Sequence, residues 1–382
     1  MTAALAGTGL TLSSCVSTPQ VEPVPVDRTG VTARVAFDAS GITDSYIDGI
    51  AEPGRLATAD DAVRIASISK LVMTLGVLRM VEERQLDLDA DVSDLLGWRL
   101  RHPTASSQPI TLRLLLSHRS GLSDRGGYVI ALGESLPAHI GNDSWHYAPP
   151  GERFEYANLG SAVVATVMEA ASGKRFDTLM ADLVFDPLGI DACYNWSGCS
   201  DETRARGIEL RDPAGRLLRD DAEERLQSCR AVIRDGEPCA LDDYIPGTNG
   251  SIFSPQGGLR ISVNGLARIG QMLLDADDDF LSADTKASLF GSARPTNDTV
   301  ICAYGLSIEA LGDCDSQLFS DGRDRVGHAG EAYHLRSGLW IDRDAGTGVA
   351  YFATAVSEPA ADGVSAFTPL ERALARGRLL KD

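Results

Sequence analysis

The chain has 382 residues, of which 43% are hydrophobic and 23% charged, and its formal net charge is −19. This composition excludes a chain that is disordered throughout, and the length predicts two domains or one compact unit of two parts. The acidic charge, together with the absence of basic runs and zinc-finger spacings in the sequence, argues against nucleic acid as a partner.

Residues 1–30 are expected to be a signal segment and a linker. A run of apolar and small residues ends at "LSSC", which looks like a bacterial lipoprotein signal with Cys15 as the lipidated residue. The Pro- and Val-rich residues 18–25 are typical of a tether. No Lys or Arg precedes the apolar run, as a secretory signal normally requires, so an ordinary apolar tail is the alternative. We expect a periplasmic protein, attached to the membrane if Cys15 is lipidated.

The first half of the chain predicts a hairpin followed by helices. Apolar and polar residues alternate around Gly41, which indicates a β-hairpin over residues 32–50. An amphipathic helix follows, with an apolar stripe at Leu71, Val72, Leu75, Leu78 and Val81. Residues 87–98 read as a loop with a short helix. Residues 111–281 read as mainly helical, with one helix ending at Gly173 and another capped by Ser262.

The tail is strand-like over residues 303–311 and 325–358, and residues 368–380 read as a last helix. We therefore predict an α+β fold (an α/β sandwich), in which an antiparallel sheet from the N- and C-terminal segments is flanked by helices. A mainly helical domain is inserted between those segments. We assign residues 31–382 to the folded unit, with the sheet from about 31–70 and 285–382 and the insert from about 71–284.

Six cysteines remain besides Cys15. They form three pairs that are local in sequence: Cys193 with Cys199, Cys229 with Cys239, and Cys302 with Cys314. Six cysteines allow 15 connectivities, so this neighbour pairing is a hypothesis, and unpaired thiols in a reducing compartment are the alternative. Disulfides would fit an exported protein. None of the six has the spacing of a zinc site, and we expect no metal.

Ser67 and Lys70 are three residues apart at the start of a predicted helix. That spacing places both side chains on one helix face, within hydrogen-bond reach. A serine hydroxyl needs a base to become a nucleophile, and a lysine whose pKa is lowered by burial can be that base. The helix N-terminus favours developing negative charge. The alternative is a surface lysine beside a capping serine, either Ser67 or Ser69.

Two further motifs give this pair a context. Tyr156-Ala157-Asn158 lies at the start of a helical stretch, where a tyrosine can relay a proton. The competing triplet Ser262-Val263-Asn264 reads as a helix cap. His328-Ala329-Gly330 lies on a strand-like segment, whose small residues would let a substrate pair with the strand edge. The competing triplet, residues 139–141, lies in a loop with no strand after it.

The order Ser-x-x-Lys, Tyr-x-Asn and Lys/His-x-Gly resembles that of the serine β-lactamase and penicillin-binding protein superfamily. The Tyr-x-Asn form and the blocks "LLSHRSGL" and "SPQGGLRIS" resemble its class C-like branch. That branch also holds D-alanyl-D-alanine carboxypeptidases, D-aminopeptidases and family VIII carboxylesterases. The resemblance covers roughly residues 32–380. It implies the β-lactamase/transpeptidase-like fold.

The resemblance also implies a serine hydrolase that works through an acyl-enzyme without a cofactor. Ser67 would be the acylated nucleophile, and Lys70 would accept its proton. Tyr156 would pass the proton to the leaving group and help to activate water. Asn158 would bind Lys70 and the substrate. The backbone N–H groups of Ser67 and Glu331 would form the oxyanion hole.

His328 departs from the class C β-lactamases, which have a lysine at that position. A histidine is mostly neutral at pH 7 and is less suited to a β-lactam carboxylate. We therefore expect a small-molecule substrate, either an ester or a D-amino-acid-containing peptide or amide. The alternatives are a β-lactamase and a non-hydrolytic penicilloyl sensor or envelope-binding module. His118, in "LLSHRSGL", is expected to be a satisfied structural histidine.

Overall fold

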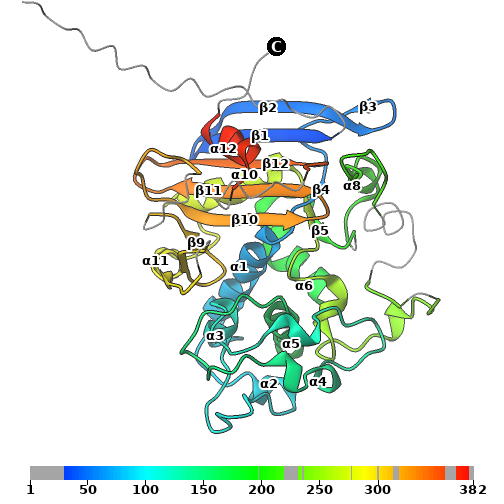
Figure 1. Cartoon of the computed structure of the whole chain (residues 1–382), viewed down its shortest axis with the longest axis vertical. Helices are drawn as coiled ribbons and strands as arrows, with labels where there is room; N and C mark the ends of the chain where they lie inside the picture. The colour runs from blue at the N-terminus through cyan, green and yellow to red at the C-terminus, as the bar shows by residue number, and fades with distance from the viewer. Residues whose placement is uncertain are drawn as a thin grey trace, which may run out of the picture.

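The computed structural model describes residues 30–196, 198–218, 231–234, 236–276, 278–298, 301–312, 318–357 and 367–377. A nine-stranded antiparallel sheet forms the upper half of the molecule in Figure 1, in the order β3-β2-β1-β12-β11-β10-β9-β8-β7. Its strands are β1 (Val31–Asp38), β2 (Gly41–Glu52), β3 (Arg55–Leu56), β7 (Arg294–Pro295), β8 (Ala303–Tyr304), β9 (Glu309–Ala310), β10 (Val326–Ala332), β11 (Leu335–Asp342) and β12 (Thr347–Ala353). Because both chain ends build this sheet, the predicted α+β architecture is confirmed.

Helices and a small second sheet make up the rest of the described chain. The second sheet has the order β4-β6-β5, with β4 (Val63–Arg64), β5 (Cys193–Tyr194) and β6 (Leu259–Ile261). The α-helices are α1 (Ile68–Glu82), α2 (Ser93–Leu96), α3 (Leu112–Leu116), α4 (Leu136–His139), α5 (Leu159–Ser172), α6 (Phe176–Met180), α7 (Asp186–Leu188), α8 (Asp201–Ala205), α10 (Val263–Leu274), α11 (Ala283–Phe290) and α12 (Pro369–Arg376). Short 3₁₀ or π turns are η1 (Asp124–Gly126), η2 (Asn142–Ser144), η3 (Ala181–Phe185), η4 (Leu241–Asp243) and η5 (Gly250–Phe253).

Several local predictions are confirmed because their signals are short-range. The first hairpin turns between Asp38 and Gly41. Helix α5 ends at Gly173, which adopts the left-handed conformation that favours glycine. The Ser262 side chain accepts a hydrogen bond from the backbone N–H of Gly265 and so caps α10.

The large sheet is covered on both faces. Successive side chains of a strand point to opposite faces, so Arg34 and Phe37 of β1 lie on opposite sides. Arg34 donates to the carbonyl of Leu374 on α12, whereas Phe37 meets Gly270 on α10. Helix α10 was expected to belong to the helical insert. It instead packs against β1, β11 and β12, because its apolar face completes the core beneath the sheet.

Helix α1 is the central element, and Figure 1 shows it running from the sheet into the helical half. It was predicted to be amphipathic, and this is wrong. All residues from Ile68 to Leu78 are buried, polar ones included, because α1 is packed between the sheet and helices α5 and α6. The polar residues Ser69, Lys70 and Thr74 are therefore inside the protein, where each needs a partner.

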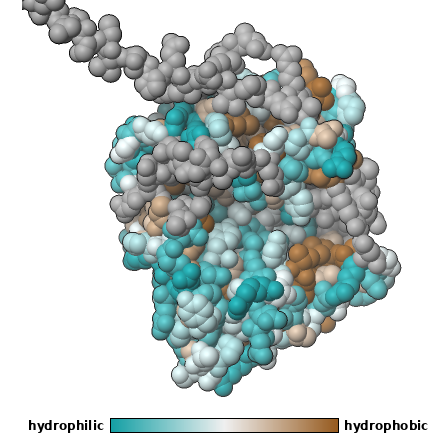
Figure 2. Space-filling view, in the orientation of Figure 1, coloured by the Kyte–Doolittle hydropathy of each residue, from teal (hydrophilic) through white to brown (hydrophobic). Residues whose placement is uncertain are grey.

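The described surface is mainly hydrophilic on the face shown in Figure 2, with apolar patches at one end of the sheet and on the right of the helical half. Exposed apolar side chains include Leu56 and Ile245. Across the described residues, every helix is too short or too polar to cross a bilayer. Cys15 lies outside these residues.

The contact between α10 and β1 makes a stability prediction. A Cβ added to Gly270 would lie 2.1 Å from the Phe37 ring, and one added to Gly348 would lie 2.4 Å from the same ring. The fully buried ring therefore has little room to move. We expect Gly270→Ala to lower the free energy of unfolding by about 1–3 kcal/mol in urea denaturation. Gly41→Ala, with no atom within 4 Å of the added Cβ, is the control and should stay close to wild type.

Candidate active site

Ser67 lies at the N-terminus of α1 but does not cap it. It is the N-cap residue, yet its side chain makes no capping hydrogen bond, so the hydroxyl remains available for chemistry. The preceding residue, Ala66, has a φ of 50°, a left-handed conformation that is strained for alanine. The Ser69 hydroxyl is occupied, because it donates to the carbonyl of Ala66 and accepts from the N–H of Leu259. The strained turn thus presents Ser67 rather than Ser69.

Lys70 is placed to act as the base for Ser67. Its side chain is buried, with Nζ 3.1 Å from the Ser67 Oγ and 2.8 Å from the carbonyl oxygen of Gln256. Burial lowers the pKa of Lys70 from 10.5 to about 7, although the charges of Asp124 and Glu309 act in the opposite direction. At neutral pH a substantial fraction of Lys70 is the free amine, which can accept the Ser67 proton.

Tyr156 completes this group. The Lys70 Nζ lies 4.8 Å from the centre of the Tyr156 ring. Burial raises the pKa of Tyr156, and its hydrogen bond with Ser67 offsets only part of that rise. Tyr156 is therefore a neutral phenol at pH 7, which can donate its proton to a leaving group but is a poor resting base. Among Lys70 and Tyr156, the lysine is the group that can accept a proton first.

Asn158 differs from its expected role. Its Nδ2 donates to Asp124 at 2.9 Å, and within the described chain no hydrogen bond joins it to Lys70. Asp124 also accepts from the backbone N–H groups of Asn158 and Leu159, both at 2.9 Å, so it caps α5. The carboxylate attracts the amide away from Lys70, and Gln256 supplies the lysine's acceptor instead. A role of Asn158 in substrate binding stays a prediction.

The His-Ala-Gly motif lies on β10 beside the start of α1. A Cβ added to Gly330 would lie 2.3 Å from the carbonyl oxygen of Ile65 and 3.3 Å from the backbone nitrogen of Ser67. Only glycine allows this approach. In the described residues β9 pairs with β10 only at Val326 and Gly327, which leaves the strand edge beyond them open for a substrate.

A backbone donor of β10 is directed to the open edge at the expected place. The backbone N–H of Ala329 already donates to the Glu309 side chain at 3.0 Å. Alternate residues of a strand direct their N–H groups to the same edge, so Glu331 presents the next outward donor. Its side chain is 62% exposed and pairs with Arg336. These features agree with an oxyanion hole from Ser67 and Glu331, which stays a prediction.

His328 is buried behind the motif rather than exposed in the cleft. Its Nε2 lies 2.8 Å from the hydroxyl of Tyr304, and its Nδ1 lies 2.5 Å from the carbonyl of Ala329 and 3.1 Å from Glu309. Two acceptors face Nδ1, so that nitrogen carries the hydrogen and Nε2 accepts from Tyr304. Burial lowers the pKa of His328 to about 3. His328 is thus neutral at pH 7, as its residue type suggested.

His118 was expected to be fully satisfied, and only half of it is. Its Nδ1 accepts from the backbone N–H of Ala157 at 3.2 Å, whereas Nε2 is buried without a partner among the described residues. The ring lies 4.2 Å from that of Tyr156 and 5.0 Å from that of Tyr304. His118 therefore supports the aromatic wall of the site.

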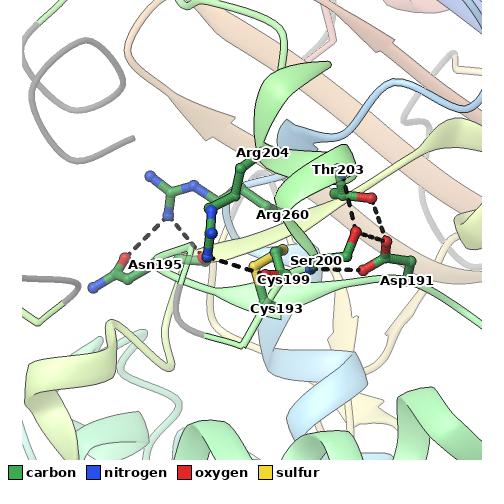
Figure 3. Close-up of a disulfide and its surroundings, with 9 residues drawn as sticks. Asp191, Cys193, Asn195, Cys199, Ser200, Thr203, Arg204 and Arg260 are labelled. Atoms are coloured by element: carbon green, nitrogen blue, oxygen red, sulfur yellow. Dashed lines mark hydrogen bonds between the residues drawn. A yellow bond between two sulfur atoms is a disulfide. The ribbon is translucent and has the colours of Figure 1, made fainter. Parts of the chain in front are cut away.

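A disulfide lies close to Asn195 and to Arg260 of β6 (Figure 3). Cys193 and Cys199 are bonded, as predicted, and enclose Asn195. The Asn195 Oδ1 accepts from Arg260 at 3.0 Å, and the same guanidinium donates to the carbonyl of Gly258 at 2.7 Å. Gly258 is two residues from Gln256, the acceptor of Lys70, so the disulfide loop fixes the backbone that holds the lysine.

The other cysteine pairings are less complete. Cys239 and Cys302 each take part in a disulfide. Cys229 and Cys314, the partners that we expected, lie outside the described residues, so both pairings stay predictions. In the described residues no cluster of three or more metal-ligating side chains occurs.

Three residues of the site were missed in the sequence. Gln256 acts through its backbone carbonyl, which leaves no signal in a sequence. Asp124 lies in an ordinary turn segment. Glu309 offered a signal, because it is a single charged residue within an apolar strand-like run, and buried carboxylates are rare.

A separate cavity of about 530 Å³ lies in the helical half. It is lined by apolar and acidic side chains, among them Trp98, Glu134 and Tyr244. The Tyr244 hydroxyl donates to the buried carboxyl of Glu169, whose pKa is raised to about 7 by burial. None of the motif residues lines this cavity, so it is not the candidate active site.

The fold and these motifs together define a protein of the β-lactamase/transpeptidase-like superfamily of serine hydrolases. Comparison with known families agrees, because the model of the family described as Beta-lactamase matches residues 25–368. The chain belongs to this family.

Individual relatives are distant. Penicillin-binding protein 4 of Amycolatopsis lactamdurans is 24% identical over 252 residues, which cover 64% of this chain and 59% of that protein. Esterase EstB of Burkholderia gladioli is 32% identical over 163 residues, which cover 37% of this chain and 40% of the esterase. The chain thus spans less than two thirds of the length of these curated relatives. The structure of the D-amino acid amidase from Ochrobactrum anthropi SV3 with L-phenylalanine superposes with a TM-score of 0.64 at 19% identity, over 90% of this chain and 92% of the amidase, which shows the shared fold alone.

The lowered pKa of Lys70 predicts a pH-dependent cost to stability. Between its folded pKa of about 7 and its unfolded value of 10.5, the unfolded chain binds a proton that the folded chain does not. The free energy of unfolding of the wild type should therefore rise with pH relative to Lys70→Met, by about 2 kcal/mol between pH 7.5 and 9.5 in urea titrations. Lys174→Met, which removes a 55% exposed lysine, is the control and should follow the wild type. Parallel curves for wild type and Lys70→Met would contradict the lowered pKa.

Proposed function

We propose that this protein is a serine hydrolase that forms an acyl-enzyme on Ser67. The observation that carries the proposal is the 3.1 Å contact between the Ser67 Oγ and a buried Lys70 whose pKa is about 7. In acylation, the Ser67 Oγ bonds to the substrate carbonyl carbon while its proton passes to the Lys70 amine. Collapse of the tetrahedral intermediate then breaks the bond to the leaving group. The leaving group takes a proton from Tyr156, and Lys70 passes the proton that it accepted from Ser67 to Tyr156. In deacylation, water bonds to the acyl carbon while one of its protons passes through Tyr156 to the Lys70 amine. The ester bond to Ser67 then breaks, and the Ser67 Oγ takes this proton back from Lys70.

The proposed substrates are small esters, or amides and peptides of D-amino acids, without a carboxylate next to the scissile bond. A β-lactam or a D-alanyl-D-alanine terminus carries such a carboxylate, and a fixed cation would bind it. At the corresponding position this chain has His328, which is neutral and buried. The buried carboxyl of Glu309 next to it also disfavours an anion.

A β-lactamase is the second candidate, because the matching family model carries that description. A penicilloyl sensor is less well supported, because a binding module has no need of a lysine with a lowered pKa beside the serine.

The test is hydrolysis of p-nitrophenyl acetate, p-nitrophenyl butyrate, D-alanine p-nitroanilide and nitrocefin by the wild type and by Ser67→Ala. We expect turnover of an ester or of the anilide, with a larger kcat/KM than for nitrocefin, and a loss of about 10³-fold or more in Ser67→Ala. Ser262→Ala, which removes only the cap of α10, should retain activity. Full activity of Ser67→Ala would refute the proposal, and a dominant nitrocefin rate would favour the β-lactamase.

We also propose export to the periplasm. The Cys193–Cys199 disulfide supports this proposal, because such bonds persist in oxidising compartments. Cell fractionation tests it: recovery of the native protein only with cytosolic markers would refute it.

A further inference from the structure

One residue of β5 reaches the first turn of α1. Tyr194 is fully buried, and its hydroxyl donates to the carbonyl of Ser69 at 2.9 Å. In the chain, Ser69 lies between Ser67 and Lys70. Its hydroxyl accepts from the backbone N–H of Leu259 on β6, the strand with which β5 pairs. The small sheet therefore supports the turn that carries the serine and the lysine.

Asn195, the next residue, binds one backbone segment at both of its ends. The Asn195 Nδ2 donates to the carbonyl of Ile252 at 3.3 Å and to the hydroxyl of Ser254 at 3.0 Å. Its backbone N–H donates to the carbonyl of Gly258 at 2.9 Å. Between these contacts lies Gln256, whose carbonyl is the acceptor for the lysine of the site. Asn195 thus fixes the position of that carbonyl.

The backbone at this point has an unfavourable conformation. Asn195 and Trp196 are both left-handed, with φ of 50° and 60°. Asparagine adopts that conformation readily, whereas it is strained for tryptophan. The Trp196 side chain is fully buried in a small apolar cluster, whose other members are Ala62, Cys193 and Cys199. The disulfide between these cysteines therefore joins the chain across the two left-handed residues and also packs against the ring.

We propose that the disulfide between Cys193 and Cys199 is a redox switch for the activation of Ser67. In the oxidised form, Tyr194 and Asn195 are positioning residues, which hold the first turn of α1 and the acceptor of the lysine in place. In the dithiol form the left-handed turn relaxes and Asn195 leaves its partners. The lysine amine is then no longer aligned with the serine hydroxyl, although the protein is folded. This regulation rests on the proposed function.

The switch closes by thiol–disulfide exchange. The two cysteine thiols lose two electrons and two protons as the S–S bond forms, and a disulfide of the oxidant gains them and becomes two thiols. Such oxidants act in the compartment to which we propose that the protein is exported. A reducing cytosol would thus hold the new chain inactive, and export would activate it. Cys193 and Cys199 are only 2% and 4% exposed, so the bond is shielded from reductants once it has formed.

The test compares the wild type with a chain that cannot form the bond, Cys193→Ala/Cys199→Ala. Near-UV circular dichroism establishes whether the variant is folded, and labelling with a fluorophosphonate at pH 8 measures how fast Ser67 reacts. We expect labelling to be at least tenfold slower in the folded variant, because the amine is misaligned. The pair Cys193→Ser/Cys199→Ser takes its place if the alanine pair does not fold.

Two single substitutions retain the disulfide and test the positioning residues separately. Asn195→Gly accepts the left-handed backbone without strain but loses the side-chain bonds to Ile252 and Ser254. Tyr194→Phe loses only the hydroxyl bond to Ser69. Each should slow the labelling by at least threefold.

Ser200→Ala is the matched control. Ser200 lies on the other side of the disulfide from Asn195 (Figure 3), where its hydroxyl accepts from the backbone N–H of Thr203 and caps α8. Its replacement weakens the same region but leaves the contacts of Tyr194 and Asn195 in place. The labelling rate should stay at the wild-type value.

NMR gives a readout that does not depend on reactivity. The chain contains only four lysines, Lys70, Lys174, Lys286 and Lys381. Protein labelled with ¹³C at the lysine Cε therefore gives four signals, and the signal lost in Lys70→Met is that of Lys70. At pH 8 this signal should move in the alanine pair and in Asn195→Gly, and it should stay in place in Ser200→Ala.

The outcomes separate this proposal from the proposed function. A folded alanine or serine pair that labels at the wild-type rate, or whose Lys70 signal stays in place, would overturn the switch. Failure of both pairs to fold would also overturn it, because the bond would then serve folding alone. If the Lys70 signal moves but the wild type is not labelled at Ser67, only the proposed function fails.

Discussion

The site depends on one amine that the fold removes from water. Lys70 is buried where the sheet meets the helical half, and its Nζ has the Ser67 hydroxyl and the Gln256 carbonyl as partners. A buried ammonium without a tightly bonded carboxylate is unfavourable, so at pH 7 the folded protein holds a substantial fraction of Lys70 as the neutral amine. The surrounding structure serves this arrangement: the strained turn at Ala66 presents the serine, and the disulfide loop fixes the segment of the carbonyl.

The negative charges around this amine offset only part of the effect of burial on its pKa. His328 is kept neutral by burial, and Glu309 and Asp124 are the carboxyls that act on Lys70. His328 therefore offers no fixed cation to a substrate carboxylate at the His-Ala-Gly strand. The site retains the groups needed for proton transfer to and from a neutral ester or amide. The burial of Lys70 and His328 thus shapes the chemistry of the site together with the motif residues.

Sequence patterns were sufficient where the determining interactions are local. The hairpin at Gly41, the helix end at Gly173 and the cap at Ser262 all follow from neighbouring residues. The Ser67–Lys70 pair was predicted because i and i+3 share a helix face. The contact of Asn158 with Asp124 was not predicted, and neither was Glu309 beside His328, because these partners come from segments that only the tertiary fold brings close. The burial of α1 on all sides also depends on long-range packing, which helical periodicity does not report.

We propose that Ser67 is a nucleophile activated by Lys70, whatever the acyl group. Labelling with a fluorophosphonate at pH 8, followed by peptide mapping with mass spectrometry, tests this most directly. We predict one adduct per chain on Ser67. It should form at least tenfold more slowly in Lys70→Met, because the Ser67 hydroxyl then lacks the amine that accepts its proton. An unlabelled protein, or an adduct on another residue with Ser67 unmodified, would contradict the account.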